Sequence, residues 1–475
     1  MITITDFKRA YSKAVKDNYA AIFAGAGLSM SSGFVDWKGL LKDLAKEIKL
    51  DVEKESDLVE VAQYYCNEKQ GRNEINQKIL NYFMTESQEN ENIKILAELP
   101  INIFWTTNYD HLIEETLKKY GKHVDVKITT QNLATTLSGN DAIVYKMHGD
   151  YLYASDCVII KDDYECYNDT RQLFSTTLQG DLVSKTFLFI GFSFEDPNLN
   201  YILSRIRVLL DKNRRTHYLF LKKISKKEYP KRADYNYAKN KQELKIHDML
   251  RYGIETVLID DYNEIPVILK DIKKMTKCNN IFISGAAHEY GSAWENTAPM
   301  FIKKLISALY KKDYKIITGH ARGIGSYVIS SVLEECQSSV SKLEKHLMIK
   351  ALPYEDNTRD DYNELIEDYR KGIFKYAGIA IFMFGNKKVN NKTILADGVY
   401  KEFQIAKQSN AYIIPIGSTG YVARKIWNEV FLNINDYPYL KKQAKVLQDC
   451  TEPQKVIDAI ISVSALVNIQ VLSLK

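Results

Sequence analysis

Ala20-Ala21-Ile22-Phe23-Ala24-Gly25-Ala26-Gly27-Leu28-Ser29 is the stretch that decides the fold. The residues before Gly25 are apolar without interruption, which is typical of a strand covered on both faces of a parallel sheet. Gly25 and Gly27 then permit a tight turn, and a helical pattern continues through Leu41. A strand, a glycine turn and a helix in this order indicate an open α/β sheet.

Three later apolar runs end at residues that can carry chemistry. Runs 101–105, 142–145 and 186–190 are followed by TTNYD, KMHGD and GFSFEDPN, and a further run covers 218–221. In open parallel sheets, ligands bind at the carboxyl ends of the strands. We therefore expect these segments to share one site with the glycine turn.

A second series of alternating strand and helix patterns begins after the polar segment 270–280. Its expected strands are 281–283, 315–317, 377–384 and 411–416, with glycine turns close behind them. Glycine turns at strand ends, with Arg322, Arg370 and Lys387 at hand, indicate a second pocket that binds phosphate groups. We predict two doubly wound parallel-sheet domains, residues 1–275 and 276–475.

Composition excludes several classes of protein. The 475 residues exceed what one hydrophobic core usually spans, and 45% of them are hydrophobic. Lys and Arg number 65 against 60 Asp and Glu, and a net charge of +5 is too small to indicate nucleic acid as a partner. The basic segment 222–245 is therefore interpreted as a solvated face.

Neither a membrane span nor a targeting segment is expected. No apolar run approaches the roughly 18 to 20 residues that cross a bilayer, and the first residues lack the layout of a signal peptide. We therefore expect a cytoplasmic protein without a membrane partner. The six cysteines form no Cys-x-x-Cys pair, so neither a disulfide framework nor a zinc site is predicted.

Each candidate residue also has an ordinary structural explanation. The Gly25–Gly27 turn alone is a weak signal, and without Gly-Lys-Ser/Thr the chain lacks the phosphate loop of nucleoside triphosphatases. A lone His148 would more often cap a strand end, and Asp110 could equally be a helix cap or a ligand. The other histidines are expected at the surface or in packing: His111, His123, His217, His247, His288, His320 and His346.

The motifs taken together are more specific. The order GAGLS, SSGFVDW, TTNYD, KMHGD, GFSFEDPN resembles the NAD-binding fold of sirtuins over roughly residues 15–260. The resemblance implies that Asn108 and His148 are catalytic, at the nicotinamide end and the ribose hydroxyls. It further implies an NAD-binding set: Ala21, Gly25, Ala26, Gly27, Ser29, Asp36, Asp110 and Ser193. Within that set, Gly25, Ala26, Gly27 and Ser29 would hold the diphosphate, Asp36 the nicotinamide ribose and Ser193 the other half of the cofactor.

The chain also departs from sirtuins that remove acyl groups. Those carry two Cys-x-x-Cys pairs after the His-Gly, whereas this interval holds only Cys157 and Cys166. We therefore expect no metal and no cofactor beyond NAD+ as substrate, and the acyl-lysine channel is in doubt. The reaction that the retained motifs could catalyse is cleavage of the bond joining nicotinamide to ribose. The rate of this reaction depends mainly on how ribose and water are positioned.

The second half resembles the SLOG superfamily of nucleotide sensors. In that family a Gly-x-x-x-Glu helix start faces ribose and an arginine faces phosphate, which here gives Gly398, Glu402 and Arg370. The enzyme signature Pro-Gly-Gly-x-Gly-Thr-x-x-Glu of related hydrolases is missing, so a sensor is favoured. The expected ligand-binding set is Ser284, Gly285, Gly319, Gly323, Gly325, Arg370, Lys387, Gly398 and Glu402.

A sirtuin-like Rossmann-type domain followed by a Rossmann-like SLOG domain resembles the NADase effectors of Thoeris anti-phage defence. The resemblance implies a NAD+ glycohydrolase, switched on when the second domain binds a cyclic ADP-ribose isomer made by a TIR-domain partner protein. It also implies a homo-oligomer. Two alternatives stay open at this point: a NAD-dependent protein deacylase, against which the missing cysteine pairs speak, and a non-catalytic nucleotide sensor.

Overall fold

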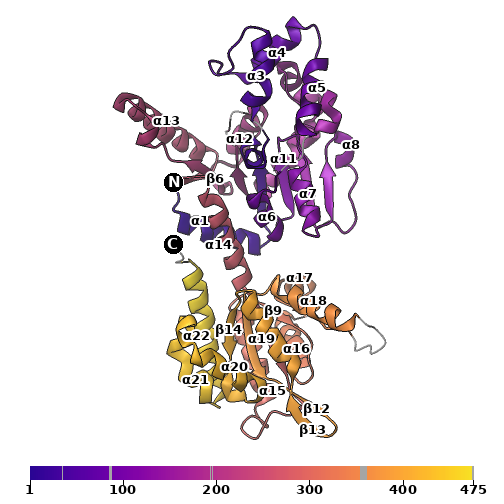
Figure 1. Ribbon diagram of the computed structural model, residues 1–475, viewed down its shortest axis with the longest axis vertical. Coiled ribbons are helices and arrows are strands. Elements are labelled where there is room, and N and C mark those ends of the chain that lie inside the picture. The colour runs from indigo at the N-terminus through magenta and orange to yellow at the C-terminus, as the bar shows by residue number, and fades with distance from the viewer. Residues whose placement is uncertain are drawn as a thin grey trace. The chain divides into compact units, whose positions relative to one another are not determined.

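The computed structural model describes residues 1–475 except Val35, 85–87, Ser193, Glu195, Ser338, 354–360 and 473–475. The chain forms two compact units, Met1–Lys273 and Lys274–Lys475 (Figure 1). The division falls inside helix α14 (Glu264–Cys278), close to the boundary expected after residue 275. Each unit is built on a parallel sheet, so the predicted α/β class is confirmed.

The first unit contains a seven-stranded sheet in the order β3-β4-β2-β1-β5-β6-β7. Its neighbouring strands pair in parallel. The strands are β1 (Ala20–Ala24), β2 (Ile103–Thr106), β3 (Val124–Lys127), β4 (Ala142–Lys146), β5 (Thr186–Ile190), β6 (His217–Lys222) and β7 (Ile254–Ile259). Chain order reverses between β1 and β5, so the topological switch point lies at their carboxyl ends.

Helices cover both faces of this sheet (Figure 1). The helices of this unit are α1 (Ile4–Lys16), α2 (Ala26–Ser29), α3 (Trp37–Glu47), α4 (Leu58–Glu68), α5 (Asn73–Phe83), α6 (Glu91–Glu98), α7 (Leu112–Lys119), α8 (Thr130–Leu133), α9 (Lys161–Glu165), α10 (Tyr167–Thr170), α11 (Gln172–Ser184), α12 (Pro197–Leu210), α13 (Arg232–Arg251) and α14. Of these, α3, α4 and α5 pack into a buried cluster of their own, away from the strands. Strand β1 shows why both faces of the sheet are covered. Its neighbouring residues Ile22 and Phe23 point to opposite faces, and each packs into a different buried cluster.

The second unit contains a five-stranded parallel sheet in the order β10-β9-β8-β11-β14, with a separate hairpin β12-β13. The strands are β8 (Asn280–Ala286), β9 (Lys315–Thr318), β10 (Leu347–Ile349), β11 (Ile379–Phe384), β12 (Asn386–Val389), β13 (Lys392–Leu395) and β14 (Tyr412–Pro415). The helices are α15 (Ala298–Lys311), α16 (Gly325–Cys336), α17 (Val340–His346), α18 (Tyr362–Phe374), α19 (Asp397–Gln408), α20 (Tyr421–Leu432), α21 (Ala444–Asp449) and α22 (Pro453–Leu472). Here the switch point lies between β8 and β11.

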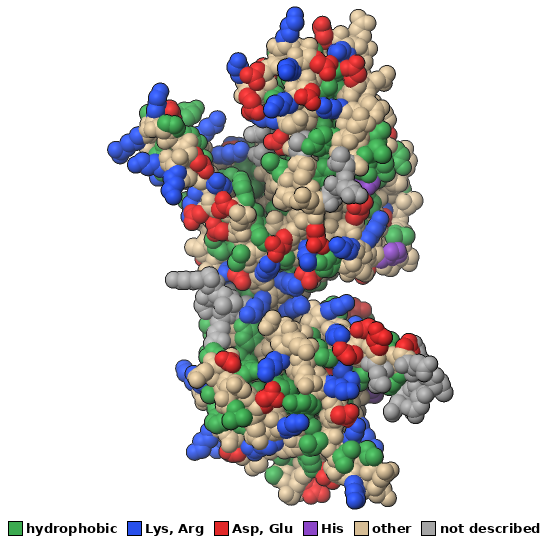
Figure 2. All heavy atoms as spheres, in the orientation of Figure 1, with side chains coloured by type: hydrophobic (Ala, Val, Ile, Leu, Met, Phe, Trp, Pro, Cys, Tyr) green, Lys and Arg blue, Asp and Glu red, His purple; other side chains and the backbone are tan. Residues whose placement is uncertain are grey.

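The predicted strands with uninterrupted apolar runs are confirmed, whereas β3, β7, β10 and the hairpin were not anticipated. Strand β3 reads Val-Asp-Val-Lys and the hairpin strands are mostly exposed, so neither carries the apolar signal used for the other strands. The basic segment forms α13, whose buried residues are Ile246 and Met249. Figure 2 shows Lys and Arg side chains gathered on this helix.

Within the part of the chain that the structure describes, no helix combines the length and apolar character needed to cross a bilayer.

Candidate functional site

The glycine turn lies at the switch point because two strand ends meet there. Gly25 N donates to Ile190 O at 3.0 Å and Gly27 N to Gly191 O at 2.9 Å. A Cβ at Gly25 would lie 2.5 Å from Gly191 O, and one at Gly27 would lie 3.0 Å from Gly191 Cα. Close backbone packing therefore explains both glycines, and their contact with a diphosphate stays a prediction.

A pocket opens beside this turn. It is lined by Ala26, Ser29, Phe34, Asp36, Trp37, Leu40, Phe83, Thr107, Asn108, Tyr109 and Asp110. Five of the residues predicted to bind or cleave NAD thus line one space, together with aromatic residues. The cavity measures about 50 Å³, far below the roughly 300 to 1,000 Å³ of a site that encloses a small molecule.

Asn108 is held by hydrogen bonds that fix the direction of its carboxamide. Its Nδ2 donates to Gly25 O at 3.1 Å and to Ser29 Oγ at 2.9 Å, so both amide hydrogens are used. Its Oδ1 is buried and has no partner among the described residues. Because Gly25 O can only accept, the amide cannot be reversed, and the free oxygen is left as an acceptor.

Ser29 links Asn108 to Asp110. Its hydroxyl accepts from Asn108 and donates to Asp110 Oδ2 at 2.7 Å, which commits its proton inside the protein. Ser29 is 3% exposed. The hydroxyl of Ser29 therefore orients Asn108, and the contact of Ser29 with the diphosphate stays a prediction.

The two aspartates of the pocket each accept a hydrogen bond at a helix start. Asp36 is the N-cap of α3, and its Oδ1 accepts from Gly39 N at 2.9 Å. Asp110 Oδ1 accepts from Leu112 N at 3.0 Å, but His111 holds the N-cap position of α7. Burial raises the pKa of Asp110, although the Ser29 hydrogen bond and the charge of Lys146 oppose the rise. Asp110 thus lies one residue before the cap, and its contact with a ligand stays a prediction.

His148 does not line the pocket. It is 2% exposed, and its ring lies edge-on to Tyr164 and Tyr167 with centroids 5.6 and 6.2 Å away. Its Nε2 lies 3.0 Å from Asp196 Oδ2, at ion-pair distance without hydrogen-bond alignment. The motif order predicted that His148 and Asn108 share one site. In the structure, Asn108 lines the pocket and His148 does not.

Asp196 was not among the predicted residues. It caps α12 by accepting from Leu199 N at 2.8 Å. Burial alone would raise the pKa of this carboxyl, but the contact with His148 and the backbone hydrogen bonds at the start of α12 together outweigh burial and hold the pKa below its ordinary value. The Asp-Pro pair at the start of α12 is a helix-cap signal, and this signal could have singled out Asp196 within GFSFEDPN.

Three other predictions have separate outcomes. Ala21 is wrong as a NAD contact, because it is fully buried in the middle of β1 and packs in the core. Ser193 lies outside the described residues. His217 is confirmed as a packing residue, and burial lowers its pKa to about 3.

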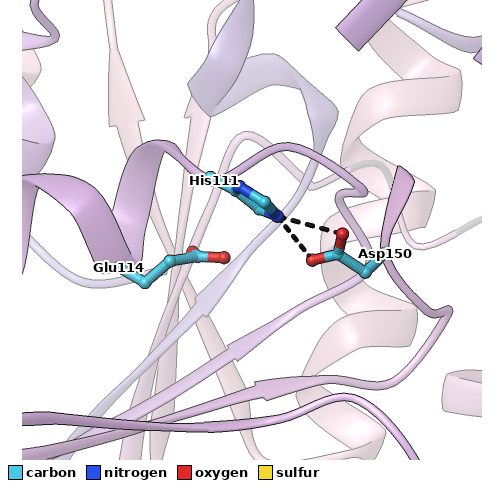
Figure 3. A group of neighbouring side chains, drawn as sticks. All are labelled: His111, Glu114 and Asp150. Carbon is cyan, nitrogen blue, oxygen red and sulfur yellow. Dashed lines mark hydrogen bonds and ion pairs between the residues drawn. The ribbon is translucent and has the colours of Figure 1, made fainter. Parts of the chain in front are cut away.

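Two cysteines and one acidic cluster of this unit are candidate metal ligands. Burial raises the pKa of Cys157 to about 12, so its thiol is a poor zinc ligand, and Cys166 is exposed. His111, Glu114 and Asp150 place ligand atoms within 4.8 Å of one another (Figure 3). The ammonium of Lys146 already lies 3.0 Å from Glu114 and 2.6 Å from Asp150, so a cation of the protein's own occupies this cluster.

A second constellation lies at the switch point of the second unit. Ser284 Oγ, at the end of β8, donates to Glu402 Oε2 on α19 at 2.5 Å. Burial raises the pKa of Glu402, opposed by that hydrogen bond and by the charge of Arg370. A Cβ at Gly398 would lie 3.0 Å from Arg370 Nη2, and the buried Nε of Arg370 has no partner among the described residues. Ser284, Arg370, Gly398 and Glu402 are thus brought together.

The remaining predicted residues of this unit are explained by packing or pairing. A Cβ would lie 2.4 Å from Met383 O at Gly285, 2.1 Å from Ala287 O at Gly323 and 2.4 Å from His320 Cα at Gly325. Gly319 has open space around it, with Lys350 O as its nearest neighbour at 3.8 Å. Lys387 lies on the exposed hairpin and forms an ion pair with Asp397.

Comparisons with known proteins cover both units. The family described as SIR2-like domain matches residues 102–246, and the Sir2- and TIR-associating SLOG family matches residues 264–467. A protein of Cytobacillus dafuensis named NAD(+) hydrolase ThsA is 45% identical over 469 residues, which cover 96% of this chain and 95% of that protein. A protein of the same name from Bacillus cereus is 46% identical over 427 residues, 89% of each chain. Defense-associated sirtuin 2 of Bacillus subtilis is 27% identical over 206 residues, 42% of this chain and 20% of that protein.

Proposed function

Because the chain belongs to the ThsA family of NAD(+) hydrolases, we propose that its first unit cleaves NAD+ into nicotinamide and ADP-ribose. The bond between the anomeric carbon and the nicotinamide nitrogen breaks, and its electron pair leaves with nicotinamide. The oxygen of water bonds to the anomeric carbon and loses one proton. Since neutral nicotinamide needs no acid to depart, the protein must stabilise an oxocarbenium-like transition state and place the water.

Asn108 is suited to place that water or a ribose hydroxyl. Both of its amide hydrogens are used within the protein, so its free Oδ1 can only accept a hydrogen bond. The buried Oδ1 without a partner is the single observation that carries the proposal, since such groups are rare unless a ligand or water meets them.

His148 is the proposed proton acceptor. Its imidazole can take the proton that water loses, and Asp196 beside it can stabilise the resulting positive charge. The pocket lining does not include His148 and the cavity is small. A bound dinucleotide must therefore widen this space until its ribose reaches His148, which makes the described arrangement a resting state.

The second unit is the proposed source of activation. A cyclic ADP-ribose isomer made by a TIR-domain partner protein would place phosphate at Arg370 and ribose hydroxyls at Glu402, as part of anti-phage defence. The free buried nitrogen of Arg370 supports an anionic ligand there. Such a ligand can activate only by binding the active arrangement more tightly than the resting one, for which assembly into a homo-oligomer offers a route.

We expect no metal in the reaction. The missing Cys-x-x-Cys pairs and the raised pKa of the Cys157 thiol argue against a zinc site of the sirtuin kind. Dialysis against a chelator should leave nicotinamide release unchanged. Loss of activity that zinc restores would contradict this part of the proposal.

The deciding experiment measures nicotinamide release by the full chain from NAD+, with and without cyclic ADP-ribose isomers of different linkage. Release that depends on one isomer supports the proposal. No release under any of these conditions would overturn it, and tight NAD+ binding without turnover would favour a non-catalytic sensor. Consumption of acylated peptide coupled to NAD+ would favour a deacylase instead.

A control separates the two units. Arg370→Ala should abolish activation by the isomer, because the arginine faces the proposed phosphate, while the first unit still binds NAD+. Asn108→Ala should abolish turnover and leave binding of the isomer unchanged. Calorimetry with each ligand distinguishes these two outcomes.

A further inference from the structure

Lys146 is fully buried and is surrounded by oxygen atoms from two motifs. Its Nζ donates to Tyr109 O at 3.1 Å, Asp110 O at 2.7 Å, Glu114 Oε1 at 3.0 Å and Asp150 Oδ2 at 2.6 Å. An ammonium has three hydrogens for these four acceptors, so at least one is shared. This is the environment a protein usually builds for a metal cation, filled here by a side chain.

The carboxylates of this environment are supported in turn. Asp150 is fully buried, and its carboxylate accepts a hydrogen bond from His111 Nε2 (Figure 3). The same carboxylate accepts a second hydrogen bond from Leu152 N at 3.0 Å. Burial would lower the pKa of Lys146, but the charges of Glu114 and Asp150 outweigh burial and raise it. Lys146 is therefore charged, and a metal ion would have to displace it.

Lys146 connects the two sequence motifs that carry the proposed catalytic residues. Lys146 and Asp150 stand on either side of His148 in KMHGD, and their ion pair closes the turn that carries the imidazole. The two carbonyls bound by the same ammonium follow Asn108 in TTNYD. One buried charge thus ties the turn bearing His148 to the loop bearing Asn108.

We infer that Lys146 is a positioning residue, which fixes Asn108 relative to His148 through the carbonyls of Tyr109 and Asp110 and the carboxylate of Asp150. The inference rests on the proposed cleavage of NAD+, because it assigns these two side chains to one reaction. Lys146 touches no substrate. Its removal changes the placement of groups that do, and displacements of about 1 Å cost a reaction about 100-fold in rate.

Removing Lys146 alone would leave two buried carboxylates without a counter-charge, and the protein could fail to fold. The variant Lys146→Met with Glu114→Gln removes one charge of each sign. We expect it to fold, with KM for NAD+ within about threefold of wild type and kcat per folded molecule about 100-fold lower. A kcat within threefold of wild type would overturn the inference.

A second variant covers the case in which the double variant does not fold. Lys146→Arg keeps the charge, but a longer planar guanidinium cannot meet the same four oxygens. We expect kcat to fall at least about tenfold, with faster hydrogen exchange at the amides of residues 107–112. Unchanged kcat and exchange would equally overturn the inference.

The matched control is Lys127→Met. Lys127 is also a buried lysine of this sheet, but it lies on the edge strand β3, and its ammonium bonds Asp125 at 2.8 Å and Thr135 O, which belong to neither motif. We expect this variant to lose stability and to keep kcat per folded molecule. Absence of nicotinamide release by the wild type would be failure of the proposed function, whereas equal release by wild type and Lys146 variants would be failure of this inference alone.

Discussion

Asp196 Oδ2 lies 3.0 Å from Nε2 of His148, and both side chains are more than nine-tenths buried. The contact joins the turn after β4 to the start of α12, two places that the sequence presents as separate motifs. A carboxylate in this position stabilises a charged imidazole and fixes which ring nitrogen remains for the substrate. With Nε2 facing Asp196, Nδ1 is the nitrogen left to accept a proton.

The first prediction concerns the pH dependence of stability in His148→Ala. Burial raises the pKa of Asp196, but the contact with His148 and backbone hydrogen bonds together hold it below its ordinary value of 3.8. In the wild type, Asp196 therefore causes no change of stability between pH 7 and pH 5. In the variant without His148, we expect burial to dominate and to raise the pKa of Asp196. Protonation on acidification then stabilises the variant, by up to about 1.4 kcal/mol per pH unit while Asp196 titrates.

Thermal melting at both pH values measures this effect as the difference between variant and wild type. Adding Asp196→Asn to the variant should remove the difference. A variant whose melting follows the wild type at every pH would show that the two groups do not interact.

The second prediction compares two buried asparagines. Asn108→Ala removes the free Oδ1 of the pocket, and we expect nicotinamide release to fall by about two to four orders of magnitude. Asn90→Ala removes an equally buried side chain, which caps α6 at Ile93 N and bonds Leu28 O. It should cost about 1 kcal/mol of stability and keep kcat. Equal loss of kcat in both variants would mean that Asn108 acts through folding.

The third prediction concerns the glycine turn. In Gly25→Ala the new methyl group would meet Gly191 O, a backbone atom that cannot move aside cheaply, so we expect a loss of about 1 to 3 kcal/mol in unfolding free energy. Gly180→Ala lies within α11 with open space around it, and should gain about 0.5 to 1 kcal/mol. Chemical denaturation measures both. A neutral Gly25→Ala would contradict the packing argument.

The fourth prediction concerns Glu402 in the second unit. Burial raises the pKa of its carboxyl, so the stability it contributes is present at low pH and is lost as pH rises through that pKa. Glu402→Gln keeps an acceptor for Ser284 without the buried charge. We expect its melting temperature to exceed that of the wild type at pH 7 and to converge with it near pH 4. Calorimetry of the full chain provides the measurement, and a variant that melts lower at pH 7 would contradict it.

The site was partly predictable, for a reason that Asn108 and Asp36 illustrate. Asn108 follows the apolar strand β2, and Asp36 stands before α3 as its N-cap, in the segment that follows β1 and the glycine turn. The parallel arrangement brings the segments after such strands to one edge of the sheet. Ala21 shows the opposite case. Motif matching placed it at the cofactor, but its position inside β1 buries it in the core.

The amino-acid sequence by itself determined the α/β class, the two sheets and the loops that carry polar groups. These features follow from the pattern of apolar and polar residues along short stretches of the chain. Only the tertiary structure decided that Asn108 offers an oxygen rather than a hydrogen, that Asp196 faces His148, and that Lys146 fills the acidic cluster. These outcomes depend on contacts of about 3 Å between segments far apart in the chain. No local pattern encodes them, since each donor could have met many acceptors until the backbone was folded.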